Sequence, residues 1–143
     1  MGNPVVGALN ILVAAGIGVL GPASEASWAL YGGLLPDAPD RAIAIIQSGG
    51  NAPWAHYALD FPQLQALIRG LPGGYLEAHA KALAVKNVFL GMDPAVADGD
   101  DWWGATLISD IAGLGTDKQS RPLLSVNIQL FVAPVSVGNR EVI

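Results

Sequence analysis

The chain has 143 residues, of which 52% are hydrophobic and only 13% are charged, and its formal net charge is −5. This length suits one domain with a core of its own. Seven Lys and Arg residues without a basic run disfavour a dedicated nucleic-acid-binding protein, and the lack of cysteine excludes disulfides, cysteine–zinc sites and cysteine nucleophiles. A chain with so little charge has apolar surface left to cover, which favours oligomerisation.

The N-terminal stretch is predicted to be a helix. Asn3 is a favourable N-cap, Pro4 suits the first helical position, and apolar residues recur at helical spacing until Gly16–Gly18. The apolar stripe is wide, which predicts burial on more than one side. No basic residue precedes it, as a signal peptide would need, and the run is too short and too rich in glycine for a membrane span. We therefore expect no membrane association.

Three strand-like runs follow a loop of small residues at Gly21–Ser27. Trp28–Tyr31 is predicted to be a short strand, and Ala42–Gln47 is a continuous apolar run, typical of a central strand covered on both faces. Gln63–Arg69 alternates, which places its leucine, alanine and isoleucine on one face and its terminal arginine on the other. The connection Ser48–Asp60 is longer than a tight hairpin needs, which is typical of a functional excursion.

A second helix is predicted at Tyr75–Leu90. Its three leucines are seven residues apart, so we expect them to form the stripe that faces the core. Glu77 and Lys81 have the spacing of a favourable ion pair, which we expect on the outer face.

The last third of the chain reads as strands. Trp103–Ile111 is a strand candidate, Ala112–Ser120 is predicted to be a polar turn, and Leu123–Val132 alternates strictly between apolar and polar residues. Residues 132–143 are predicted to be a C-terminal tail that needs a partner to become ordered. The order of elements indicates a single α+β domain over residues 1–143. We expect a mostly antiparallel sheet of about four to five strands, with two helices packed on one face.

The sequence provides no motif for catalysis or for a cofactor. His56 and His79 lack partners at metal-ligand spacing, and the acidic run Asp98–Asp101 does not have the spacing of an EF-hand. The glycines of Gly16–Gly21 match a dinucleotide-binding pattern but follow a helix and lead into a proline. We predict no catalytic, cofactor or metal site and no enzyme activity, while a looser calcium site at Asp98–Asp101 stays open.

Aromatic residues in loops and at strand edges are the strongest candidates for an interaction surface. Rings in such places often anchor protein interfaces, although they can also cap the ends of a small core. The predicted subunit or partner interface comprises Trp54, His56, Tyr57, Phe61, Trp102 and Trp103.

A succession of short motifs covers nearly the whole chain. Leu35–Asp40 reads LPDAPD, and Ala42–Gly50 is an apolar strand that ends in a double glycine. An aromatic loop follows, then Asp60–Gly70 reads DFPQLQALIRG, and after an alanine-rich helix Ser125–Ile128 reads SVNI. This succession resembles the tail terminator, or minor capsid, proteins of long-tailed bacteriophages. The glycine-rich first helix and the Trp102–Trp103 pair depart from that pattern.

The resemblance implies an α+β protomer in a homo-oligomeric ring, usually a hexamer, at the head-proximal end of the tail tube. Such a ring stops tube growth, contacts the tail tube protein and the head-completion or stopper protein, and lets DNA pass its lumen without specific binding. It implies a place in the tail or neck of the virion, after assembly in the host cytoplasm, and gives the loop Ser48–Asp60 a role in contacting a neighbouring subunit or ring. The alternatives are another neck component such as a head-closure protein, a monomeric enzyme, or a small calcium- or ligand-binding domain.

Overall fold

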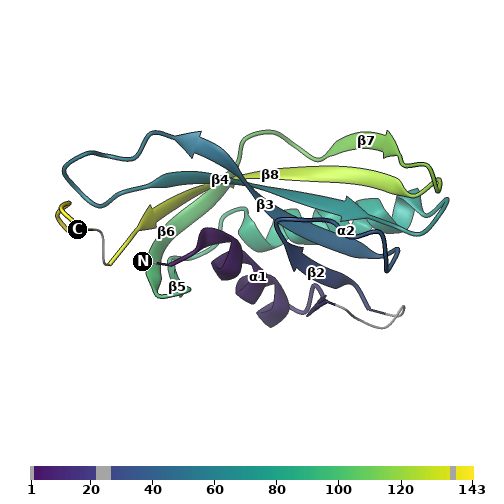
Figure 1. The fold of residues 1–143 in the computed structure, drawn as a ribbon, viewed down its shortest axis with the longest axis horizontal. Coiled ribbons are helices and arrows are strands. Elements are labelled where there is room, and N and C mark those ends of the chain that lie inside the picture. The colour runs from purple at the N-terminus through teal and green to yellow at the C-terminus, as the bar shows by residue number, and fades with distance from the viewer. Residues whose placement is uncertain (1, 22–26, 136–137) are drawn as a thin grey trace.

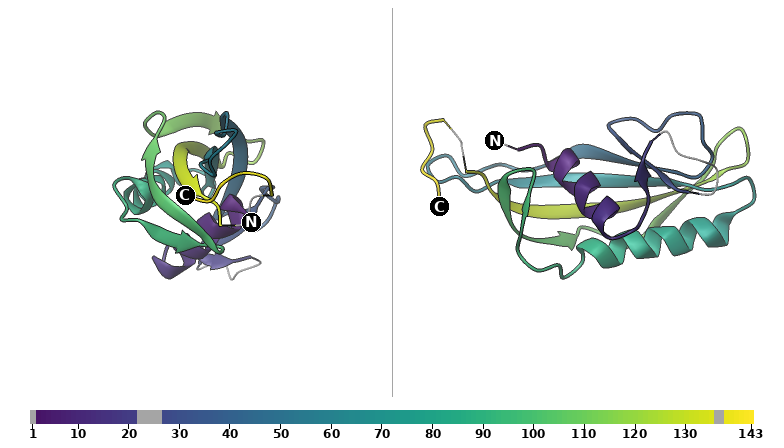
Figure 2. Two further views of the ribbon diagram at one scale, coloured as in Figure 1. Left: turned by 90° about the vertical axis from the view of Figure 1, so that its left-hand side faces the viewer. Right: turned by 90° about the horizontal axis from the view of Figure 1, so that it is seen from below.

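The computed structural model describes residues 2–21, 27–135 and 138–143, and most of the predicted loop Gly21–Ser27 lies outside them. A curled sheet runs along the long axis of the protomer, and two helices pack against it (Figures 1 and 2). The elements in chain order are α1 (Pro4–Ala14), β1 (Val19–Leu20), β2 (Ala29–Gly32), β3 (Ala42–Asn51), β4 (Phe61–Arg69), α2 (Tyr75–Phe89), β5 (Ala95–Ala97), β6 (Asp100–Leu107), β7 (Ala112–Thr116) and β8 (Pro122–Ala133).

The sheet is mixed and has more strands than the sequence predicts. Its order is β1-β2-β3-β4-β8-β6-β5, with β7 paired to β8. The long strands β3, β4 and β8 are antiparallel neighbours, whereas β2 pairs with β1 and β3 in parallel. The α+β class is confirmed. The expected number of four to five strands is wrong, because β1, β5 and β7 were not predicted from the sequence. Segments of two to five residues carry almost no periodic signal.

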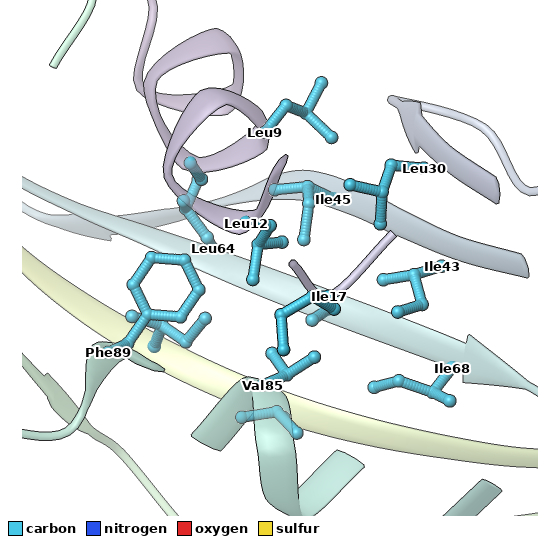
Figure 3. Close-up of a cluster of buried hydrophobic side chains, with 14 of the residues drawn as sticks. Leu9, Leu12, Ile17, Leu30, Ile43, Ile45, Leu64, Ile68, Val85 and Phe89 are labelled. Atoms are coloured by element: carbon cyan, nitrogen blue, oxygen red, sulfur yellow. The ribbon is translucent and has the colours of Figure 1, made fainter. Parts of the chain in front are cut away.

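One hydrophobic core joins both helices to the sheet (Figure 3). The alternation predicted for β8 is confirmed, since every second residue from Leu124 to Val132 is buried. The other face of β8 is less exposed to solvent than expected, because Ser125 and Gln129 are also buried. The side chains labelled in Figure 3 are Leu9, Leu12, Ile17, Leu30, Ile43, Ile45, Leu64, Ile68, Val85 and Phe89.

Helix α1 begins and ends where the sequence predicts. The Asn3 side chain accepts a hydrogen bond from the Val5 amide at 2.8 Å, and Gly16 adopts φ +76° just after the helix. The predicted burial of α1 on more than one side is confirmed in part. Gly7 packs against Trp102, and Leu9 lies against Gly32. Val6 and Val13, in contrast, are 39% and 40% exposed on the remaining side.

Helix α2 lies on the sheet with the opposite face to the one predicted. Its buried residues are Ala78, Ala82, Val85 and Phe89. The leucines expected in the core are exposed, and Leu76 is 83% exposed. Small residues let the helix approach the sheet closely: a Cβ placed on Gly70 would lie 2.9 Å from the Cβ of Ala78. The leucine spacing therefore marks an apolar stripe on the outside, which we call the α2 stripe: Leu76, Leu83 and Leu90.

The predicted ion pair between Glu77 and Lys81 is also wrong. The Glu77 carboxylate accepts a hydrogen bond from Arg41 Nε at 2.6 Å, and this bond lowers the pKa of Glu77. Lys81 instead donates to the Ile17 carbonyl at 3.0 Å, and its ammonium lies 5.5 Å from the centre of the Trp28 ring. Both side chains reach away from their helix toward other elements.

No helix among the described residues is long and apolar enough to cross a membrane.

The reversed face of α2 can be tested by substitution. We expect Phe89→Ala to lower the free energy of unfolding by about 3–5 kcal/mol, because it removes a fully buried ring. Leu76→Ser should change it by less than about 0.5 kcal/mol, because that side chain is mostly exposed. Urea unfolding of both variants is the measurement, and a larger loss for Leu76→Ser would restore the predicted face.

Candidate functional site

A buried arginine anchors the Pro/Asp turn that precedes β3. The Arg121 side chain is 3% exposed, and its Nη2 and Nη1 atoms lie 3.0 and 3.1 Å from Asp37 and Asp40. Its Nε donates to Asp117 at 2.8 Å. A guanidinium offers five donors in a fixed fork, so one side chain can hold several acceptors at once. This arginine cluster, Arg121 with Asp37, Asp40 and Asp117, ties the turn to the start of β8.

A second arginine completes the anchor from β4. Arg69 was predicted to point to solvent, but it is 3% exposed. Its Nη2 donates to the Pro39 carbonyl at 2.7 Å and its Nε to the Asp40 carbonyl at 3.1 Å. Burial, and then the neighbouring Arg121, lower the pKa of Arg69. The prediction is wrong because the alternation of apolar and polar residues along a strand cannot show that a turn covers one face of the sheet and offers carbonyl groups to Arg69.

The charges of the arginine cluster stabilise one another. Burial alone would lower the pKa of Arg121, but hydrogen bonds to Asp117, Asp37 and Asp40 raise it. Burial would likewise raise the pKa of Asp117, whereas hydrogen bonds from the Arg121 amide and guanidinium lower it. The sequence offered one signal for this cluster, the two aspartates of the turn, but their partner lies more than 80 residues away.

The opposite end of the protomer is an open hairpin loop. β3 continues past Ile45, where its pairing with β2 ends, and stays paired with β4 as far as Asn51 (Figure 1). The excursion is thus residues 52–60, which is shorter than the predicted Ser48–Asp60. The first described residues, from Gly2, and the C-terminal segment also lie at this end of the protomer (Figure 1). We call residues 52–60 the β3–β4 loop.

Aromatic side chains gather on this loop as the sequence suggested. Trp54 is 51% exposed and Tyr57 48% exposed. The Trp54 ring lies edge-on to Phe61 at 6.1 Å between centroids, and the His56 ring lies 4.7 Å from that of Tyr57. Four of the six predicted interface residues therefore lie on or beside the β3–β4 loop.

The tryptophan pair on β6 is divided between two faces. Successive residues of a strand point in opposite directions, so Trp103 is 47% exposed while Trp102 is 1% exposed. A Cβ placed on Gly7 of α1 would lie 2.8 Å from Trp102 Cζ2. Placing Trp102 at an interface is wrong for this protomer, because its ring fills the contact between α1 and β6.

The acidic run holds the chain's own backbone. Asp98 accepts a hydrogen bond from the Asn3 amide at 2.7 Å, and Asp100 accepts one from the Gly2 amide at 2.8 Å. In the part of the chain that the structure describes, no group of three or more His, Asp or Glu side chains could hold a metal ion. A cleft of about 590 Å³ lies between this N-terminal segment and the β3–β4 hairpin.

The C-terminal segment docks on the β3–β4 loop. Arg140 contacts Asp60 at 2.6 Å, and the Glu141 amide donates to the His56 carbonyl at 2.8 Å. The tail was expected to order only with a partner, but residues 138–143 have contacts within the protomer. Sequence reasoning missed this contact because irregular segments carry no periodic pattern.

Large exposed hydrophobic side chains are spread over the surface. Leu34, Leu76 and Val96 are the most exposed, at 71%, 83% and 71%. Such a surface fits a subunit that is covered in an assembly. Together, the fold and this surface define a small α+β domain with many exposed apolar side chains.

Comparison with known proteins identifies the family of this chain. The sequence model described as bacteriophage tail terminator protein matches residues 11–133, so the chain belongs to this family and the resemblance is confirmed. A solved chain titled "Virion of native gene transfer agent (GTA) particle" has a similar fold, with a TM-score of 0.59 and 16% identity over 72% of this chain and 77% of that chain. No curated protein matches. The protein is a structural, tail-related protein of a phage-type virion.

The arginine cluster should dominate the stability of its end of the fold. Arg121→Lys keeps one charge but loses the fork, and a buried ammonium cannot donate to Asp37, Asp40 and Asp117 together, so we expect a loss of about 3 kcal/mol in unfolding free energy. Arg41→Lys, at the more exposed pair with Glu77, should cost less than about 1 kcal/mol. Equal losses in urea unfolding would contradict this ranking.

Stability should also fall in acid. The folded-state pKa values of Asp117, Glu77 and Asp110 are lowered, so their contribution is fully present above about pH 5 and is lost as pH falls through about 4 and below. Unfolding free energies from pH 7 to pH 3 test this. Asp117→Asn should reduce the loss of unfolding free energy between pH 7 and pH 3. An unchanged loss in that variant would show that Asp117 does not contribute to the acid sensitivity.

Proposed function

We propose that this chain is a tail terminator that forms a ring, a hexamer, at the head-proximal end of the tail tube. The ring ends tube polymerisation and joins the tail to the head-completion protein. The observation that carries this proposal is the family match over residues 11–133. It acts in the virion tail or neck, after assembly in the host cytoplasm.

Two exposed patches of the protomer support the proposal of a closed ring. Subunits in a cyclic ring meet through two different patches, one on each side of the protomer. The exposed rings of the β3–β4 loop supply one candidate patch, and the α2 stripe supplies another. Aromatic side chains are favoured anchors in such contacts. We assign the β3–β4 loop to contact with a neighbouring subunit or with the next ring.

The charge of the chain supports passage of DNA without specific binding. Six of the seven Lys and Arg side chains contact oxygen atoms of the same chain: Arg41, Arg69, Lys81, Lys86, Arg121 and Arg140. Cations held in this way are poorly placed to grip phosphates, and the net charge is −5. DNA would therefore pass the lumen without adhering to it.

The alternative of a calcium- or ligand-binding domain gains no support from the acidic run. Asp98 and Asp100 each accept a hydrogen bond from the backbone at the start of the chain, so they have a structural role. A head-closure protein would fill a neighbouring place in the neck. No observation favours it over the terminator.

Substitution of Trp54 tests the assembly role of the β3–β4 loop. We expect Trp54→Ala to weaken the ring while the protomer keeps its unfolding free energy within about 1 kcal/mol, because the ring of Trp54 is half exposed. Native mass spectrometry measures the ring and urea unfolding measures the protomer.

Tyr75→Ala is the matched control, since Tyr75 is also 51% exposed but is the first residue of α2, which follows the end of β4 remote from the β3–β4 loop. A Trp54→Ala protein that assembles like the wild type would remove this residue from the ring contact. Wild-type protein that stays monomeric over the concentrations tested would contradict ring formation.

A further inference from the structure

Residues 138–143 contact the β3–β4 loop through the charged side chain of Arg140. Arg140 Nη1 donates to Asp60 Oδ1 at 2.6 Å, and Nη2 reaches Oδ2 at 3.4 Å. The same Nη1 donates to the Trp54 carbonyl at 3.3 Å. The Arg140 side chain is 18% exposed and that of Asp60 is 25% exposed, so solvent screens this ion pair only partly. One guanidinium thus spans the loop from its aromatic tip to its base.

Backbone hydrogen bonds add a short parallel pairing. The Glu141 amide donates to the His56 carbonyl at 2.8 Å, and the Ala58 amide donates to the Glu141 carbonyl at 2.6 Å. Tyr57 and Glu141 are partners in this bridge. The base of the loop is held separately, because Asp60 exchanges backbone hydrogen bonds with Val132 of β8 at 2.8 and 3.0 Å.

The remaining support for the loop tip is slight. Residues 52–57 are exposed. Besides the edge-on contact of the Trp54 ring with Phe61, the Trp54 amide donates to the Leu59 carbonyl at 3.0 Å and the Leu59 amide donates to the Tyr57 carbonyl at 2.9 Å. Exposed loops with few buried contacts open most readily, so added bonds change their order most. The C-terminal segment supplies such bonds at the positions flanking the exposed rings.

We propose that residues 138–143 are a latch that holds the β3–β4 loop in one conformation and thereby sets where Trp54 and Tyr57 lie on the surface. Arg140 and Asp60 are its positioning residues. The interaction surface at this end is composite, built from the hairpin and from the end of the chain. The inference deepens the proposed function, and only its assembly readout rests on that function.

Hydrogen exchange on Arg140→Gln tests the latch directly. We expect the amides of residues 54–59 to exchange roughly tenfold faster than in the wild type at the same oligomeric state, because a charge-assisted hydrogen bond is lost. Arg140→Lys keeps the charge beside Asp60 and should give an intermediate rate. Arg41→Gln breaks another 2.6 Å ion pair and should leave these amides unchanged. Unchanged exchange in Arg140→Gln would overturn the latch.

A disulfide can replace the lost ion pair, because the chain has no cysteine of its own. Tyr57→Cys and Glu141→Cys, added to Arg140→Gln, place two thiols at the bridge partners. Oxidation should restore slow exchange in the loop and give a crosslinked monomer on a non-reducing gel. A ladder of covalent oligomers would overturn the latch within one protomer, since the segment would then dock on a neighbour's loop.

The assembly readout separates the latch from the proposed function. Faster loop exchange together with a weakened ring in Arg140→Gln supports both. Faster loop exchange with an intact ring supports the latch and contradicts the role of the loop in ring contact.

Discussion

The contact of Arg121 with three carboxylates is the interaction on which this fold most depends. It joins the turn before β3, the turn before β8 and β8 itself at one end of the protomer. Arg69 adds hydrogen bonds from β4 to the same turn. The Arg121 guanidinium is buried, so losing its carboxylate partners costs more than losing a surface pair, and these contacts help to align the three long strands. At the opposite end, where Trp54 and Tyr57 are exposed, a charged contact is formed by the partly exposed pair of Arg140 and Asp60.

This division of charge explains how a chain with only 13% charged residues serves as a structural subunit. Most of its cations stabilise turns, helices or the C-terminal segment, which leaves apolar side chains to form much of the surface. The α2 stripe is the clearest case, because its leucines face outward while alanines pack on the sheet. A monomer would expose this surface to water, whereas a ring would cover it.

The sequence predicted what strong local patterns encode. The cap at Asn3, the alternation of β8 and the succession of motifs that resembles the family were all confirmed. It failed where tertiary contacts decide: α2 has apolar residues on two sides, and its spacing alone could not show that the smaller ones face the sheet. Trp102 and Trp103 looked equivalent until the pleat separated them. Arg121 binds Asp37 and Asp40, and Arg140 binds Asp60, across at least 80 residues of sequence, so no local pattern could reveal these contacts.

A cryo-electron microscopy map of the head-proximal end of the tail tests the central claim most directly. We expect six copies of this chain in one ring at the end of the tube, with the β3–β4 loop against a neighbouring copy or the adjacent ring. Density for this chain at another level of the neck, or a tube that ends without it, would contradict the assignment as tail terminator.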